Sequence, residues 1–213
     1  RPTNIMGVSK RLAELVVQSF AQNDSLTKES KYTKTIFAMV RFGNVLGSSG
    51  SVVPLFEKQI KKGGPITITH PDIIRYFMTI KEAAQLVMQS SALAEGGEVF
   101  LLDMGEPVKI YDLACQMVKL SGLKVKGVDN NLNGIQIITT GLRPGEKLYE
   151  ELLIDSKAEK TKHDLIFKAS ERRIDFNILW PLIEELENQL KNQNLKEVFL
   201  ILQKLVPEWK MRS

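Results

Sequence analysis

The sequence predicts an α/β protein in which helices alternate with strands that are buried on both faces. An amphipathic helical pattern near the start of the chain is followed by a polar stretch at 23–34 and then by a short apolar run at 35–40. A second apolar run stands at 99–102. Continuous runs without polar alternation are typical of strands inside a parallel sheet. Helix, loop and buried strand in this order therefore indicate the α/β class.

Composition and charge are those of an ordinary globular protein. The 213 residues suffice for one large domain or for one and a half small ones. The net charge is +4, but the lysines and arginines are scattered, so the sequence predicts no nucleic-acid partner. Cys115 is the single cysteine, which excludes an intramolecular disulfide and indicates a reducing compartment. No apolar run approaches the roughly 18 residues of a membrane span, so no membrane contact is predicted for this chain.

The first predicted helix carries two side chains of chemical interest. Met6 and Lys10 stand at positions i and i+4, so both side chains project from one helical face. On the spacing alone, a buried methionine beside a solvated lysine is the simpler interpretation. The helix is expected to run to about Gln22, with a buried stripe formed by Leu12, Leu15, Val16 and Phe20.

The remaining elements follow from apolar periodicity and from residues that start or stop helices. The expected helices lie at 54–63, 80–88, 110–118, 179–190 and 195–205, and the expected strands at 66–69, 99–102 and 135–139. A capping box at 79–82 begins the second of these helices, whose buried stripe is expected to be Ile80, Ala83, Ala84, Val87 and Met88. The later part of the chain alternates less regularly, which suggests a sheet domain with a smaller substrate domain appended to it.

A Gly/Ser-rich segment at 41–54 leaves the carboxyl end of the first buried strand. In open α/β sheets, ligands bind in the crevice beyond these strand ends. Glycines allow close backbone approach there, and hydrogen-bonding groups are supplied by Asn44, Ser48, Ser49 and Ser51. A turn-rich connector is the simpler interpretation if this segment is taken alone.

Two further segments contain an arginine in a setting suited to phosphate. In the motif Gly-Leu-Arg-Pro-Gly-Glu-Lys, Arg143 offers a rigid fork for phosphate oxygens, and Glu146 offers acceptors for ribose hydroxyls. An exposed turn before a short helix at 148–153 is an equally good interpretation. Arg75 stands beside two aromatic residues, which indicates either a diphosphate contact or surface stacking. The two histidines are far apart in the sequence, and no metal site is predicted.

Together, in their order and spacing, these motifs resemble the nucleotide-sugar 4,6-dehydratases of the polysaccharide-biosynthesis family, which are extended short-chain dehydrogenases/reductases. The resemblance runs from Arg1 to about Leu153 and continues more weakly through the terminal helices. Met6 stands where the tyrosine of the Tyr-x-x-x-Lys motif usually stands, as in the larger, membrane-anchored members of the family. The resemblance is carried by the segments 1–7, 41–47, 49–51, 75–79 and 143–147.

The resemblance implies the C-terminal portion of a Rossmann-like, doubly wound parallel sheet together with a smaller α/β substrate-binding domain. The Gly-rich cofactor half is expected to precede Arg1, because the sequence contains no G-x-G-x-x-G. Residues 1–45, with 79–103 returning to them, are expected to belong to the dinucleotide-binding domain. Residues 46–213 are expected to form mainly the nucleotide-sugar-binding domain and the C-terminal helices.

The implied reaction is the dehydration of a UDP-linked N-acetylhexosamine, commonly UDP-N-acetylglucosamine, with NAD or NADP as the cofactor. The sugar is oxidised at C4, water is eliminated across C5 and C6, and hydride returns to C6. Lys10 is expected to hydrogen-bond the nicotinamide ribose and to lower the pKa of the catalytic base. Met6 cannot be that base because it has no ionisable proton, so the acid/base groups are expected before Arg1.

The resemblance also assigns binding residues. The cofactor is expected to contact Lys10, Arg41 and Gly43. The UDP-sugar is expected to contact Asn44, Ser49, Ser51, Val52, Arg75, Arg143 and Glu146. The chain by itself is expected to be inactive. The intact protein is expected to be a cytoplasmic homo-oligomer, anchored to the inner membrane by a segment before Arg1, that acts in the synthesis of bacterial capsule or O-antigen.

Two alternatives remain open. The first is a nucleotide-sugar epimerase or reductase of the same superfamily, because the C-terminal half discriminates these activities poorly. The second is a non-catalytic NAD-binding regulator, which the methionine at the tyrosine position makes worth considering. The presence of both Arg143 and Glu146 favours an enzyme over such a regulator.

Overall fold

The structure is a computed structural model that describes residues 2–22, 35–128, 133–150 and 158–209. The expected loop at 23–34 and part of the expected helix at 148–153 lie outside the described residues. The chain forms two compact units, each assembled from segments that are not consecutive. The first unit comprises Arg1–Arg41, Leu86–Leu102 and Leu153–Ser213, and the second comprises Phe42–Gln85 and Asp103–Leu152.

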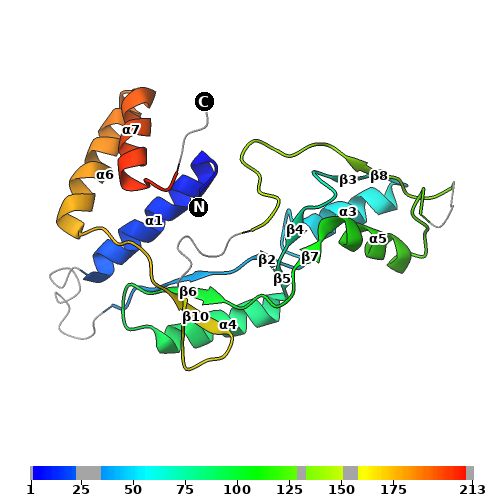
Figure 1. The fold of residues 1–213 in the computed structure, drawn as a ribbon, viewed down its shortest axis with the longest axis horizontal. Coiled ribbons are helices and arrows are strands. Elements are labelled where there is room, and N and C mark those ends of the chain that lie inside the picture. The colour runs from blue at the N-terminus through cyan, green and yellow to red at the C-terminus, as the bar shows by residue number, and fades with distance from the viewer. Residues whose placement is uncertain (1, 23–34, 129–132, 151–157, 210–213) are drawn as a thin grey trace. The chain divides into compact units, whose positions relative to one another are not determined.

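A four-stranded sheet in the first unit has the order β1 (Met39–Arg41), β6 (Val99–Leu102), β10 (Ile166–Ala169) and β9 (Ala158–Lys160) (Figure 1). β1 and β6 are parallel, and every residue of β6 is buried, so the strand expected at 99–102 is confirmed. The strand expected at 35–40 is wrong in extent and burial, because β1 is half-buried and begins only at Met39, and Ile36 and Phe37 before it are exposed. β10 is antiparallel to both β6 and β9, which makes the sheet mixed and not wholly parallel. The sequence does not predict β9, because all of its residues are exposed and lack an apolar pattern.

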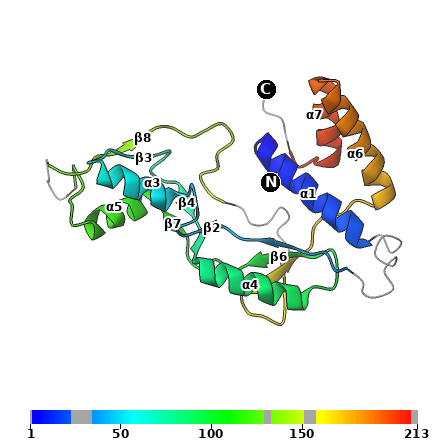
Figure 2. The same ribbon diagram turned by 180° about the vertical axis from the view of Figure 1, so that it is seen from behind.

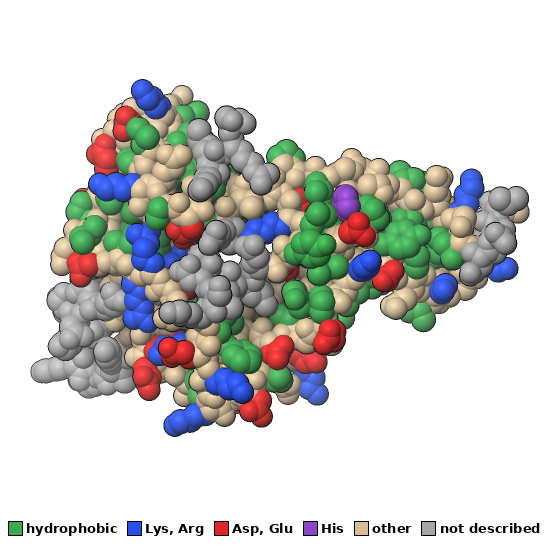
Figure 3. Space-filling model, in the orientation of Figure 1, with side chains coloured by type: hydrophobic (Ala, Val, Ile, Leu, Met, Phe, Trp, Pro, Cys, Tyr) green, Lys and Arg blue, Asp and Glu red, His purple; other side chains and the backbone are tan. Residues whose placement is uncertain are grey.

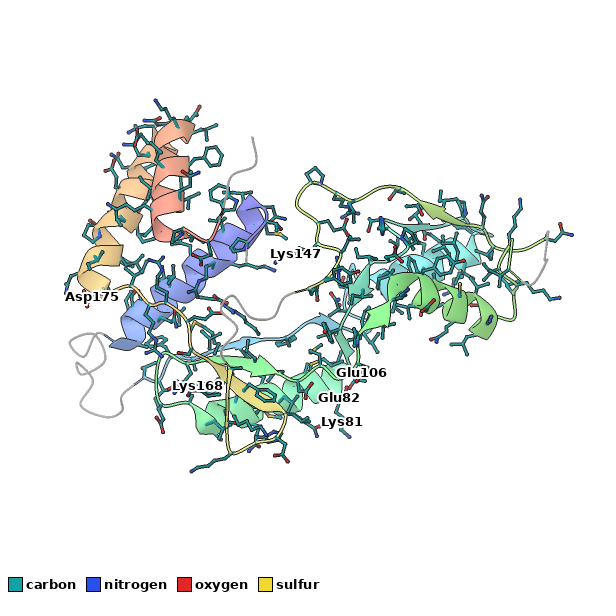
Figure 4. The ribbon with its side chains drawn as sticks, viewed as in Figure 1. Lys81, Glu82, Glu106, Lys147, Lys168 and Asp175 are labelled. Atoms are coloured by element: carbon teal, nitrogen blue, oxygen red, sulfur yellow. The ribbon has the colours of Figure 1, made fainter. Side chains whose placement is uncertain are left out.

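Three helices pack together in the first unit: α1 (Ile5–Gln22), α6 (Phe176–Lys191) and α7 (Leu195–Leu205). They lie side by side in both ribbon views (Figures 1 and 2). Asp175, labelled in Figure 4, caps α6 because its side chain accepts a hydrogen bond from the backbone N of Asn177. The expected apolar stripes meet in one core, whose buried members include Val8, Leu15, Leu179, Leu186, Leu202 and Leu205.

The helix α4 (Ile80–Leu93) leads into β6 and begins at the expected capping box. The backbone N of Thr79 donates to Glu82 Oε2 at 2.7 Å, and the backbone N of Glu82 donates to Thr79 Oγ1 at 3.2 Å. Glu82 is labelled in Figure 4. The bonds from the Thr79 backbone and hydroxyl lower the pKa of the Glu82 carboxyl. The prediction of the buried face of α4 is wrong. Ala83 and Leu86 are buried, but Ile80 and Met88 are exposed. The spacing 83, 86 and 90 also follows one helical face, and that is the face turned inward.

Short strand pairs, two whole helices and the first residues of α4 make up the described part of the second unit. β2 (Asn44–Val45) pairs in parallel with β5 (Phe77–Met78), β3 (Ile66–Ile68) in parallel with β8 (Ile137–Thr139), and β4 (Ile74–Arg75) antiparallel with β7 (Val108–Lys109). The helices α3 (Val52–Lys61) and α5 (Ile110–Leu120) share a core that includes Phe56, Ile60, Ile66 and Val118. The expected helices at 54–63 and 110–118 and the strands at 66–69 and 135–139 are confirmed, with their ends shifted by one or two residues.

Charges of both signs are mixed over the surface. On the face shown in Figure 3, Lys and Arg side chains are interspersed with Asp and Glu side chains. This mixture accords with the small net charge of +4. In the part of the chain that the structure describes, no helix is both long and apolar enough to cross a bilayer.

The compact units divide the chain differently from the boundary expected at residue 45. Residues 79–103 are expected to return to the first part, and of these Leu86–Leu102 lie in the first unit. The segment Leu153–Ser213, which is expected elsewhere, belongs to the first unit as well. The C-terminal segment does so because the apolar stripes of α6 and α7 are buried against α1. The assignment of cofactor binding and sugar binding to these units stays a prediction.

Leu179 tests the packing of the three helices, because it is fully buried in their common core. Leu179→Ala should lower the free energy of unfolding by about 2–5 kcal/mol, since it removes buried methyl groups and leaves a cavity. Its neighbour Ile178 is 61% exposed, so Ile178→Ala should change that free energy by less than about 0.5 kcal/mol. Urea denaturation followed by circular dichroism measures both values. Equal losses in the two variants would contradict the described packing.

Candidate functional site

Met6 and Lys10 lie on the exposed side of α1, close to its start. Asn4 caps the helix, because its Oδ1 accepts a hydrogen bond from Gly7 N at 2.9 Å and its carbonyl accepts one from Val8 N at 3.1 Å. Met6 is 61% exposed, and Lys10 is also exposed. The interpretation of Met6 as a buried core residue is therefore wrong. α1 instead presents a thioether and an ammonium group on one accessible face.

Arg41, at the end of β1, is bound by two carboxylates of the first unit. Its Nε donates to Glu14 Oε1 at 2.5 Å, and its Nη1 and Nη2 donate to Glu171 Oε1 and Oε2 at 2.6 and 2.8 Å. Burial alone would lower the pKa of Arg41, but the hydrogen bonds and charges of Glu14 and Glu171 outweigh burial and raise the pKa. The guanidinium therefore stays charged and already has protein partners. The expected contact between Arg41 and a cofactor stays a prediction.

Gly43 lies where two parts of the second unit approach closely. A Cβ added to Gly43 would lie 3.0 Å from the carbonyl oxygen of Tyr76 and 3.1 Å from Met104 Cε. The backbone N of Gly43 also donates to Met104 Sδ at 3.4 Å. Packing therefore explains the glycine at this position. Its expected contact with a cofactor stays a prediction.

The Gly/Ser segment ends at the start of α3. Ser51 occupies the N-cap position of α3, but its hydroxyl makes no capping hydrogen bond. Ser51 Oγ is buried and has no hydrogen-bond partner among the described residues. Ser49 is exposed, and Val52, the first residue of α3, is half-buried. A buried hydroxyl beside the unpaired N–H groups of a helix start is suited to an anionic oxygen.

Arg75 and Glu146, which belong to separate expected segments, are in contact in the second unit. Arg75 Nη2 lies 3.7 Å from Glu146 Oε1, and Arg75 Nε lies 3.3 Å from Glu150 Oε1. Glu146 Oε1 also accepts a hydrogen bond from Thr69 Oγ1 at 3.0 Å, and Glu146 Oε2 accepts one from Arg143 N at 3.0 Å. The side chain of Arg143 is exposed. One carboxylate thus joins the end of β3, the strand β4 and the turn that presents Arg143.

The three expected ligand segments meet in the second unit. Asn44 N donates to Tyr76 O at 2.9 Å, so the Gly/Ser segment is paired with the segment of Arg75. Ile74 N donates to Leu148 O at 3.0 Å, so the segment of Arg75 is joined to the chain that follows Arg143. The residues expected to contact the UDP-sugar all belong to this unit, and within it Arg75, Glu146 and the backbone of Arg143 are in contact.

Sequence reasoning misses several side chains that hold these residues. Thr69 and Glu150 contact Glu146 and Arg75, but no local pattern in the sequence indicates them. Glu171 is brought to Arg41 by the fold alone, across a long stretch of sequence. Glu14 could have been predicted to form an ion pair, because it stands three residues after Arg11 on a predicted helix.

Each of the two histidines stabilises a turn by accepting a hydrogen bond from a nearby backbone N. His70 Nδ1 accepts a hydrogen bond from Asp72 N at 3.1 Å, and His163 Nδ1 accepts one from Leu165 N at 3.2 Å. No group of three or more His, Cys, Asp or Glu residues that could hold a metal ion occurs within the described ranges.

Known proteins share this fold. A UDP-glucose 4-epimerase from Thermus thermophilus, solved with NAD, has a TM-score of 0.52 at 19% identity, over 68% of this chain and 44% of that chain. The fold is therefore the C-terminal part of the Rossmann-like α/β fold of short-chain dehydrogenases/reductases, as expected. The family described as polysaccharide biosynthesis protein matches residues 1–171. The chain belongs to this family, which confirms the expected resemblance.

Two relatives are more similar. The capsular polysaccharide biosynthesis protein CapD of Staphylococcus aureus is 48% identical over 200 residues, which are 92% of this chain and 31% of CapD. The X-ray structure of Pen from Bacillus thuringiensis has a TM-score of 0.63 at 34% identity, over 82% of this chain and 51% of that chain. The chain thus spans about a third of CapD and about half of Pen.

Gly43 provides a test of the close approach in the second unit. Gly43→Ala should lower the free energy of unfolding by about 1–3 kcal/mol, because the new methyl group meets a backbone carbonyl that cannot rotate away. Thermal and urea denaturation measure the loss. Adding Met104→Ala should lower the stability further, because Met104 is itself buried and the cavity left by its truncation outweighs the relieved contact with Met104 Cε. An alanine variant as stable as the parent would show that the approach is looser than described.

Proposed function

We propose that the protein containing this chain is an NAD- or NADP-dependent 4,6-dehydratase that acts on UDP-N-acetylglucosamine or a similar UDP-N-acetylhexosamine. The observation that supports the proposal is the joining of the segments of Asn44, Arg75 and Arg143 by backbone hydrogen bonds, within the unit to which the other expected sugar-nucleotide residues also belong. Met6, which stands at the tyrosine position of the Tyr-x-x-x-Lys motif, favours the type of dehydratase that the sequence resembles. Membership of the polysaccharide biosynthesis protein family and the likeness to CapD support a role in surface-polysaccharide synthesis.

The sugar-nucleotide clamp requires donors for two phosphates and acceptors for a ribose. Arg143, whose side chain is exposed, supplies charge-assisted donors, and the guanidinium fork matches phosphate geometry. Arg75 would exchange a contact with Glu146 or Glu150 for a phosphate oxygen on binding. Ser51 Oγ, buried at the start of α3, can donate to a phosphate oxygen. Glu146 is oriented by Thr69 and by the backbone of Arg143, which leaves lone pairs on its carboxylate for ribose hydroxyls.

Lys10 fits the ribose of a nicotinamide cofactor, because its exposed ammonium group donates hydrogen bonds and accepts none. When bound, the cofactor supplies the hydride acceptor for C4 and the hydride donor for C6. Lys10 holds the ribose and, through its positive charge, lowers the pKa of a neighbouring base. Met6 cannot accept the C4 hydroxyl proton, so the base is expected in sequence before Arg1. The chain alone is therefore expected to be inactive, and a homo-oligomeric state stays a prediction.

The experiment that tests this proposal separates dehydration from epimerisation. The full-length protein is incubated with UDP-N-acetylglucosamine, and the product is analysed by mass spectrometry. The expected product has lost the mass of one water. A new sugar of unchanged mass would identify an epimerase instead. Retained NAD binding without any conversion of the sugar would favour a non-catalytic regulator.

Lys10 and Met6 are expected to differ sharply in importance within the full-length protein. Lys10→Ala should abolish turnover, because the ribose loses its donor and the base loses the positive charge beside it. Met6→Ala should cost much less, since the thioether transfers no proton. Turnover is measured with the mass assay above. If Met6→Ala proved as damaging as Lys10→Ala, the assignment of the base to another segment would be wrong.

Arg143 is expected to contribute to binding more than to the chemical step. Arg143→Ala should mainly raise KM, because it removes a charge-assisted phosphate contact worth roughly 1.5–3 kcal/mol. The exposed Lys126 of the same unit provides a matched control, and Lys126→Ala should leave KM unchanged. Initial rates at varied UDP-N-acetylglucosamine give both constants. A fall in kcat at constant KM would contradict a binding role for Arg143.

A further inference from the structure

Beneath the exposed face of α1, the first unit contains a cluster of charged side chains that we call the α1 charge cluster. Its members are Arg11, Glu14, Arg41, Glu171 and Glu208. Arg11 Nη1 lies 3.0 Å from both Glu14 Oε2 and Glu171 Oε2, and Arg11 Nε lies 3.2 Å from Glu208 Oε1. The Arg11 side chain is 3% exposed, and that of Glu171 is 0% exposed. These ion pairs are therefore shielded from solvent and salt.

The cluster ties α1 to segments that are distant in the sequence. Glu171 follows β10, and Glu208 follows α7. Arg11 Nη2 also donates to the carbonyl oxygen of Arg172 at 2.8 Å. The side chain of Arg172 in turn donates to the carbonyl oxygen of Leu205, the last residue of α7. The C-terminal segment is thereby fastened to one residue of α1.

Fastening Arg11 also fixes the direction of Lys10. Consecutive helical residues project about 100° apart, so holding the helix at Arg11 also sets the direction in which the Cα–Cβ bond of Lys10 points. The guanidinium fork of Arg11 has several acceptors in defined directions, which leaves α1 little freedom to rotate or slide. Lys10, adjacent to Arg11, is exposed.

We propose that Glu171 and Glu208 are positioning residues for Lys10, acting through Arg11. This inference rests on the role of Lys10 in the proposed function. Glu208 and α7 lie beyond residues 1–171, the part matched by the polysaccharide biosynthesis protein family. In this proposal α6 and α7 affect the reaction by holding α1, the helix that carries Lys10, in place.

Conservative substitutions in the full-length protein test the proposal. Glu171→Gln and Glu208→Gln remove one carboxylate each, and Arg11→Lys keeps the charge but loses the planar fork. In each, kcat should fall on the order of ten- to a hundred-fold, because a small displacement of a catalytic group has an effect of this size. KM for UDP-N-acetylglucosamine should stay at the parent value, since the sugar-nucleotide residues belong to the second unit. The matched control is Glu187→Gln, which breaks the exposed pair with Lys191 on α6 and should alter neither constant.

A second measurement does not depend on turnover. Hydrogen exchange of the α1 amides should be faster in Glu208→Gln than in the parent, and unchanged in Glu187→Gln. If Glu171→Gln fails to fold, Glu208→Gln carries the test, because its carboxylate is partly exposed and pairs with Arg11 alone among the cluster members. Folded variants with the parent kcat and the parent exchange rates would overturn the proposal.

The outcomes also separate this inference from the proposed function. Loss of turnover in Lys10→Ala, with the parent kcat in both glutamine variants, rejects the positioning role and leaves the proposed function standing. Full turnover in Lys10→Ala rejects the role of Lys10, and with it the positioning role, whereas the dehydration itself is rejected only if the parent protein forms no dehydrated product. If the parent protein does not convert UDP-N-acetylglucosamine, hydrogen exchange still shows whether the cluster holds the helix that carries Lys10.

Discussion

The arrangement of the first unit depends on the burial of one carboxylate. The Glu171 side chain is 0% exposed, and a carboxylate removed from water is stable only where cations and hydrogen bonds replace its hydration. Arg11 and Arg41 provide these partners from a helix and from a strand. The setting of α1 against β1 therefore follows from an electrostatic requirement as well as from apolar packing. Apolar contacts alone tolerate sliding, whereas a guanidinium bound on several sides does not.

The second unit contains a carboxylate with a related task in a different setting. Glu146 joins Thr69, the backbone of Arg143 and the guanidinium of Arg75, yet its side chain remains 21% exposed. Its neighbours orient the Glu146 carboxylate but leave it partly exposed to solvent. A fully buried carboxylate can only stabilise the fold, whereas a partly exposed one can also bind a ligand. Exposure is thus what distinguishes the two sites, because both are built from Arg–Glu contacts.

Periodicity is sufficient to predict the helices and the central strand. The stripes of α1, α6 and α7 repeat at helical spacing, and β6 is an unbroken apolar run. The strand β9 could not be predicted, since its exposed residues have no apolar pattern and its pairing depends on tertiary contacts. The candidate site likewise has residues that the sequence predicts and residues that only the fold brings together. Arg75 and Glu146 are recognisable from their motifs, but only the folded chain brings Glu171 to Arg41.

The interleaved order of the two units has a consequence for how the chain folds. The chain passes from one unit to the other four times, after residues 41, 85, 102 and 152. The first unit cannot be completed from any continuous stretch, because its first helix is packed against its last two. Contacts of such long sequence separation form late and slowly. During synthesis, α1 is among the first parts of this sequence to leave the ribosome, and it must wait for the final helix before its apolar face and its buried arginine are covered.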